Sequence, residues 1–133
     1  MTDNMIELAK RAVACKGWRW SSGMLWLVKR AAPLEDYAGR AVLGYTRPHE
    51  ALPVLTDAAT VGCLLALVRE ALNVPTAHVL PSFGAWYIER DAQDGSEDSE
   101  WLHVDGVWGC GSAAVIGAKA EAEALVAALE SAP

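Results

Sequence analysis

The sequence predicts an α+β fold in a single domain that spans residues 1–133. Apolar residues recur at helical spacing at the start, in the middle and at the end of the chain. Between these stretches lie short apolar or aromatic segments, and most of their connections are too short to hold a helical crossover. We therefore expect a mostly antiparallel sheet packed on a central helix, with N- and C-terminal helices, in the order α-β-β-β-α-β-β-β-α.

Residues 56–72 are predicted to form the central helix. Thr56 or Asp57 can cap its first turn with a side-chain oxygen, and Asn73 and Pro75 favour its end. One face of this helix carries Val61, Leu64, Leu65, Val68 and Leu72. Other apolar residues extend this apolar surface almost all the way round the helix, so we expect it to be the most buried element.

The remaining elements follow from local patterns. The terminal helices are predicted at residues 3–15 and 119–132. Strands are predicted at residues 18–20, 24–29 and 41–46 before the central helix. After it, they are predicted at residues 77–80 and 85–90 and in a last hairpin formed by residues 101–104 and 107–108. Loops are predicted at residues 32–39 and at the acidic stretch 91–100, with hairpin turns at residues 81–84 and at Asp105-Gly106.

Composition excludes several classes of protein. The hydrophobic content of 53% and the six Trp argue against disorder. No apolar run reaches the roughly 18–20 residues that span a bilayer, and no signal peptide is recognisable, so we expect a soluble intracellular protein with no membrane partner. The net charge of −6 disfavours binding to duplex DNA. Residues 1–50 nevertheless carry eight Lys or Arg against five Asp or Glu, whereas residues 51–133 carry three against twelve.

Metal and cofactor sites are not indicated. Cys15, Cys63 and Cys110 lie far apart with no CxxC pairing, so we expect three free thiols. The acidic residues 91–100 do not have the spacing of an EF-hand loop, which leaves a solvated loop or an acidic docking surface for a basic protein. A glycine-rich stretch at residues 109–114 lacks the βαβ context of a dinucleotide fingerprint. We therefore expect no metal and no cofactor.

The basic first part of the chain contains the candidate ligand-binding residues. In a strand over residues 18–20, Trp18 and Trp20 point to one face and Arg19 to the other. Two Trp on one face are typical of a core, but they can also form a stacking platform for a base, with cations nearby for phosphate. The candidate ligand-binding residues are Lys16, Trp18, Arg19, Trp20, Arg40 and Arg47.

Three blocks of the sequence resemble small accessory proteins of tailed phages and prophages that have no assigned activity. The blocks are residues 14–20 (ACKGWRW) with Gly23-Met24, residues 57–71, and residues 121–130. Together they cover about a quarter of the chain. The resemblance carries over no functional residue. It implies a setting in the cytoplasm of a host cell, where such proteins often act against host defence.

The sequence thus favours a non-enzymatic binding protein that acts in counter-defence. Its partner would be a host defence protein, which it inhibits, or a small signalling nucleotide, which it sequesters. Exposed strand edges in a short sheet would also allow a homo-oligomer to form. The alternative is a small hydrolase or nucleotide-cleaving enzyme that uses His49, His78 or His103, although none of these has a catalytic partner at a recognisable spacing.

Overall fold

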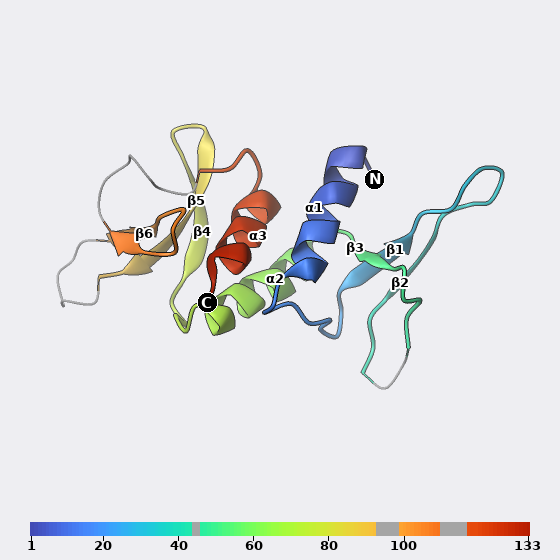
Figure 1. Ribbon diagram of the computed structural model, residues 1–133, viewed down its shortest axis with the longest axis horizontal. Coiled ribbons are helices and arrows are strands. Elements are labelled where there is room, and N and C mark those ends of the chain that lie inside the picture. Colours follow the sequence, from blue (N-terminus) through green and yellow to red (C-terminus); the bar gives the residue numbers. More distant parts are fainter. Residues whose placement is uncertain (44–45, 93–98, 110–116) are drawn as a thin grey trace. The chain divides into compact units, whose positions relative to one another are not determined.

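The computed structural model describes residues 1–43, 46–92, 99–109 and 117–133. These residues form an α+β protein with three helices and two antiparallel sheets, in which strands follow the first and the second helix (Figure 1). The α+β class is therefore confirmed. The chain divides into two compact units, Met1–Cys63 and Leu64–Pro133, and the helix α2 (Ala58–Ala71) begins in the first and ends in the second.

The first unit contains helix α1 and a three-stranded sheet. Helix α1 (Asp3–Ala14) begins at Thr2, whose Oγ1 accepts a hydrogen bond from the backbone of Met5. It buries a stripe of small and apolar side chains and packs against strand β3 (Leu52–Pro53). Strands β1 (Leu25–Val28) and β2 (Tyr37–Arg40) complete the sheet in the order β2-β1-β3. Strand β1 lies at the centre of this sheet and buries Trp26 and Val28, and Trp26 lies opposite both Gly39 and Pro53.

Two of the three strands predicted in this unit are wrong. Residues 18–20 and 41–46 form no strand in the part that the structure describes, and β2 lies at the end of a predicted loop. The Trp-rich segment has strong strand propensity, but no strand of the described residues pairs with it. Tyr37–Arg40 contains a glycine and has weak propensity, yet it pairs with β1 through four residues. Pairing across the hairpin therefore overrides local preference here.

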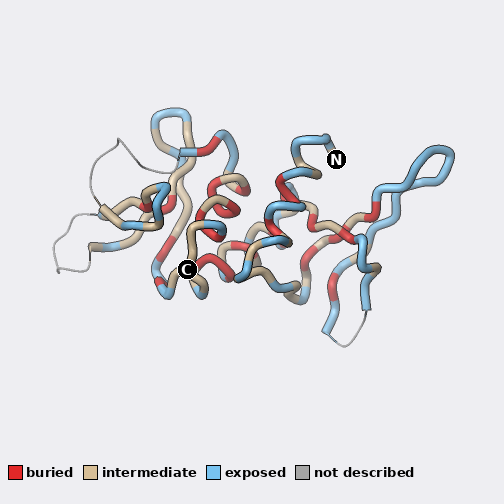
Figure 2. Tube along the Cα trace, in the orientation of Figure 1, coloured by how far each residue is buried: buried red, intermediate tan, exposed pale blue. Residues whose placement is uncertain are grey.

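The second unit packs helix α3 (Glu121–Ser131) on a four-stranded sheet. Strands β4 (His78–Ser82), β5 (Ala85–Asp91), β6 (Ser99–Leu102) and β7 (Trp108–Gly109) follow one another in chain order. Helix α3 contacts β4 and β5 and carries more buried residues than any other described element of this unit (Figure 2). The buried residues of α3 are Ala122, Ala124, Leu125, Val126, Ala128 and Leu129.

Local turn chemistry fixes the hairpins and the end of α2 as predicted. Phe83 and Gly84 both have positive φ, 50° and 77°, which is the pattern of a type I′ turn between β4 and β5. Gly106, with φ 85°, turns the chain between β6 and β7. Asn73 adopts φ 56° and ends α2, with hydrogen bonds from its N–H to Glu70 and from the next N–H to Arg69.

The prediction that α2 is the most buried element is wrong. Thr60, Leu64, Leu67 and Val68 are buried, which makes a stripe along one face of the helix. Gly62 and Ala66 are exposed on another face. Small residues leave little apolar area in water, so the helix tolerates this exposure at low cost. Helix α3 is the more completely buried of the two.

Candidate functional site

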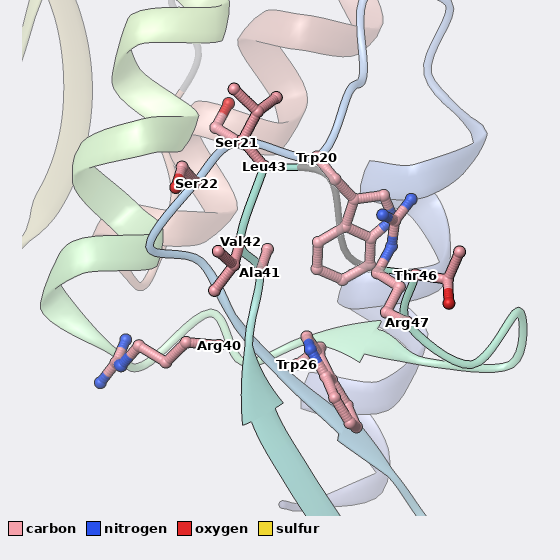
Figure 3. Close-up of a pocket in the computed structure, with 10 residues that line it drawn as sticks. All are labelled: Trp20, Ser21, Ser22, Trp26, Arg40, Ala41, Val42, Leu43, Thr46 and Arg47. Carbon is pink, nitrogen blue, oxygen red and sulfur yellow. The ribbon is translucent and has the colours of Figure 1, made fainter.

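A hollow of about 240 Å³ lies in the first unit, above the sheet and beside the segment that precedes β1 (Figure 3). Its walls come from residues 20–22, from β1 and from the chain that continues β2. A hollow of this size is smaller than a typical drug-sized pocket, so it can enclose one planar ring or one anionic group of a ligand while the rest of that ligand stays outside. It is lined by Trp20, Ser21, Ser22, Trp26, Arg40, Ala41, Val42, Leu43, Thr46 and Arg47.

Arg47 and Trp20 form a stacked pair in this wall. The guanidinium carbon of Arg47 lies 4.3 Å from the centre of the Trp20 ring, the geometry of a cation–π contact. Partial burial lowers the pKa of Arg47 from its ordinary value, but an Arg keeps its charge at neutral pH. No ion pair joins Arg47 to a carboxylate among the residues that the structure describes. The hollow therefore presents a cation whose charge a ligand can use.

Arg40 lies on the same hollow, but its guanidinium is held by Asp57. Its two terminal nitrogens lie 2.7 and 2.9 Å from the two carboxylate oxygens of Asp57, and one of them also donates to the carbonyl of Gly23 at 3.0 Å. The hydrogen bonds from Arg40 lower the pKa of Asp57 well below its usual range, and the same contact raises the pKa of Arg40. Arg40 therefore lines the hollow with a guanidinium whose charge is already balanced by Asp57.

Thr60 connects this ion pair to the sheet. Asp57 caps α2, because its Oδ2 accepts from the backbone N–H of Thr60 at 3.0 Å and from the Thr60 hydroxyl at 2.9 Å. The same hydroxyl accepts from the backbone N–H of Leu25 at 2.8 Å. Thr60 is fully buried, so these bonds form in a dry environment where they matter most. The start of α2 is therefore fixed to β1 and to Arg40.

The indole of Trp26 forms the floor of the hollow, and its position requires glycine at residue 39. A Cβ added at Gly39 would lie 2.6 Å from the Trp26 ring, so only glycine lets the indole lie across β2. The ring of Tyr37 packs edge-on against the same indole at 5.1 Å. Trp26 is nearly fully buried, which gives the hollow a rigid aromatic base.

Three of the six predicted site residues line this hollow. Trp20, Arg40 and Arg47 meet there, although they come from separate segments. Lys16, Trp18 and Arg19 do not line it. Trp18 packs edge-on against Trp20 at 5.5 Å, and its ring nitrogen is buried without a hydrogen-bond partner in the described part of the chain. Sequence reasoning overlooked Asp57 as the partner of Arg40, because its capping position already explained it.

The histidines occupy other places. His49 is almost fully exposed and pairs with Glu50 at 3.1 Å. His78, in the second unit, pairs through Nε2 with Glu89 at 3.0 Å, and its Nδ1 lies 3.2 Å from the carbonyl oxygen of Thr76. Glu89 also accepts from the ring N–H of Trp101 at 2.9 Å. The buried Nε2 of His103 has no hydrogen-bond partner among the described residues.

The described residues contain no group of three or more His, Cys, Asp or Glu side chains that could hold a metal ion. None of the described helices is both long and apolar enough to cross a membrane. Cys15 and Cys63 are free thiols, and Cys110 lies outside the described residues. Most of the acidic stretch 91–100 and of the glycine-rich stretch 109–114 also lies outside them.

Comparison with known proteins gives no relative from which a function could be transferred. The chain matches no protein-family model, no curated protein and no solved structure.

Proposed function

We propose that this protein is a non-enzymatic binding protein that takes a small nucleotide at the hollow of its first unit. The observation that carries the proposal is the Arg47–Trp20 stack, which places a planar cation in the wall of the hollow. The indole of Trp26 forms the floor of the same hollow. A base can stack on a guanidinium plane or on an indole, and a phosphate can accept hydrogen bonds from Arg47. Ser21, Ser22 and Thr46 add neutral polar residues to the lining of the hollow.

The distribution of charge supports a small ligand over a long nucleic acid. The whole chain has a net charge of −6, which repels an extended polyanion. Because Arg40 is neutralised by Asp57, Arg47 is the cation left to meet one phosphate. The resemblance to phage accessory proteins adds a biological setting, in which the bound nucleotide is a signalling molecule of host defence and binding sequesters it.

Calorimetric titration with AMP, a cyclic dinucleotide, adenosine and inorganic phosphate tests this proposal. We expect the phosphorylated nucleotides to bind more tightly than adenosine or phosphate alone. Arg47→Ala should weaken nucleotide binding about 10- to 100-fold, since it removes both a stacking plane and a charged donor. Arg47→Lys keeps the charge but loses the guanidinium plane, so its nucleotide affinity should lie between those of the wild type and Arg47→Ala. Lys16→Ala is the matched control, because Lys16 is exposed and lies outside the hollow.

Failure of all four probes to bind, or equal affinity of the Arg47→Ala variant and the wild type, would contradict the proposal. Native mass spectrometry of the protein purified from infected host cells then distinguishes the two forms of the binding hypothesis. A retained nucleotide supports sequestration. A retained host protein would instead indicate that the protein inhibits a defence effector directly.

The alternative is a nucleotide-cleaving enzyme, and the His78–Glu89 pair is the observation that favours it. A histidine hydrogen-bonded to a carboxylate can act as a general base. Both ring nitrogens of His78 already face acceptor oxygens, however, which leaves no free lone pair directed at a substrate. Incubation of the same nucleotides with wild type and His78→Ala, followed by chromatography, would reveal a product that only the wild type forms if this alternative were correct.

A further inference from the structure

The four edge strands of the two sheets differ in how well they are protected against pairing with a strand from another chain. β3 has two residues, one of them Pro53, and it is packed by α1. β4 carries the exposed Pro81, and β7 has two residues. Proline has no N–H, so it blocks the addition of another strand. β2 is the exception among the described strands, because it has four residues and no proline.

The free edge of β2 still offers its backbone groups. Ala41 uses its N–H and its carbonyl to bond Met24 and Gly23, on the side of β1. Because backbone groups alternate along a strand, Ala38 and Arg40 direct their N–H and C=O groups away from β1. Neither N–H has a backbone partner in the described part of the chain.

The side chains along this edge do not repel a second strand. The charge of Arg40 is neutralised by its bidentate pair with Asp57. On either side of Arg40 stand exposed apolar residues: Tyr37 is 46% exposed, Val42 is 52% exposed and Leu43 is 91% exposed. An edge with apolar ends and a neutralised centre is complementary to itself when one copy runs antiparallel to the other.

We propose that the β2 edge pairs with the β2 edge of a second copy of this chain. The pairing extends β2 beyond Arg40 through Val42 and Leu43, which form no strand in the single chain. The two-fold axis passes beside Arg40, so that Tyr37 lies opposite Leu43 of the partner subunit and Ala38 lies opposite Val42 of the partner subunit. The two sheets then form one continuous antiparallel sheet. Leu43 lines the hollow, so the pairing also brings Tyr37 of the partner subunit to its wall. The pairing does not depend on which ligand the hollow takes.

Sedimentation velocity of the full chain over a range of concentrations tests this pairing. We expect a concentration-dependent dimer. Ala38→Pro removes one outward N–H from each copy, hence two hydrogen bonds from each dimer, and should raise the dissociation constant about ten-fold or more. Phe83→Lys is the control, because it removes an exposed apolar side chain from the β4–β5 hairpin and should leave the dimer intact. Unchanged circular dichroism and melting temperature of Ala38→Pro at low concentration would show that the monomer still folds.

A second experiment tests the register without relying on proline. In a background with the native cysteines replaced by serine, mixing Tyr37→Cys and Leu43→Cys chains under mild oxidation should give a mixed disulfide dimer faster than either chain gives a dimer alone. A wild type that stays monomeric at every concentration would overturn the proposal. So would a dimer that survives both Ala38→Pro and Leu43→Lys. Absence of the mixed disulfide would overturn the register.

Discussion

Thr60 is the buried polar residue on which the start of α2 depends. Its hydroxyl accepts from Leu25 and donates to Asp57, and no water is needed to complete this arrangement. Thr60→Val keeps the shape of the side chain but leaves the Leu25 N–H without its acceptor. We expect a loss of about 1–3 kcal/mol in the free energy of unfolding, measured by urea denaturation.

Thr60→Ser is the control for this prediction, because it keeps the hydroxyl and loses one methyl group. Its loss of stability should be the smaller of the two. A Thr60→Val protein as stable as the wild type would mean that the hydrogen bonds from β1 to α2 contribute nothing.

Asp57 gives the molecule an acid-sensitive contact. Its folded-state pKa is lowered by Arg40, so its contribution to stability is fully present above the ordinary Asp pKa of about 4 and is lost as the pH falls below that value. Asp57→Asn should therefore lower the melting temperature by a constant amount between neutral pH and mild acid. The difference from the wild type should shrink as the pH falls further.

Arg40→Gln tests whether the same pair is responsible. In a double-mutant cycle, the second substitution should cost little once Asp57 has been replaced by Asn. If the melting temperatures of wild type and Asp57→Asn differed equally at all acidic pH values, the Asp57 carboxylate would not be the titrating group.

At the scale of elements, the one-sided burial of α2 distinguishes two neighbouring leucines that the sequence places on the same apolar face. Leu64 is fully buried, whereas Leu65 is only partly buried. Because the sequence places both leucines on one apolar face, it predicts a loss of about 2–5 kcal/mol in the free energy of unfolding for Leu64→Ala and for Leu65→Ala. The structure keeps that expectation for Leu64→Ala and predicts a clearly smaller cost for Leu65→Ala, which leaves a smaller cavity. Chemical denaturation of the two variants in parallel measures the difference, and equal losses would contradict the one-sided burial of α2.

At the scale of the whole molecule, the hollow lies in the first unit, so a ligand that binds there should change hydrogen exchange in that unit and not in the second. Binding of AMP at the hollow should slow backbone hydrogen exchange in residues 20–28 and 37–43, because a ligand stabilises the segments that line it. Strands β4 to β6 should be unaffected. Mass spectrometry of peptic peptides measures both regions at once. Protection around His78 and Glu89 instead would move the site to the second unit.

The sequence predicted the elements whose causes are local. Apolar spacing located the three helices of the described residues, and glycines marked the turns at Gly84 and Gly106. Thr56 or Asp57 was a predicted cap of α2 and Asn73 its predicted end, and the structure shows that Asp57 is the cap. It also predicted Trp20, Arg40 and Arg47 as site residues, and the structure brings these three to one hollow. Spacing along the chain cannot reveal that Asp57 neutralises Arg40, because the two residues are far apart in sequence and meet only when β2 lies beside the start of α2.

The sequence by itself therefore determined the α+β class, the helices and the turns, because helical periodicity, caps and positive φ depend on residues within a few positions of one another. Only the tertiary structure decided that the strands form two sheets, that Tyr37–Arg40 is a strand and residues 18–20 are not, and which face of α2 is buried. A strand exists only where another strand supplies its hydrogen bonds, and a side chain is buried only where another element covers it. Both conditions depend on contacts between residues that are distant in sequence.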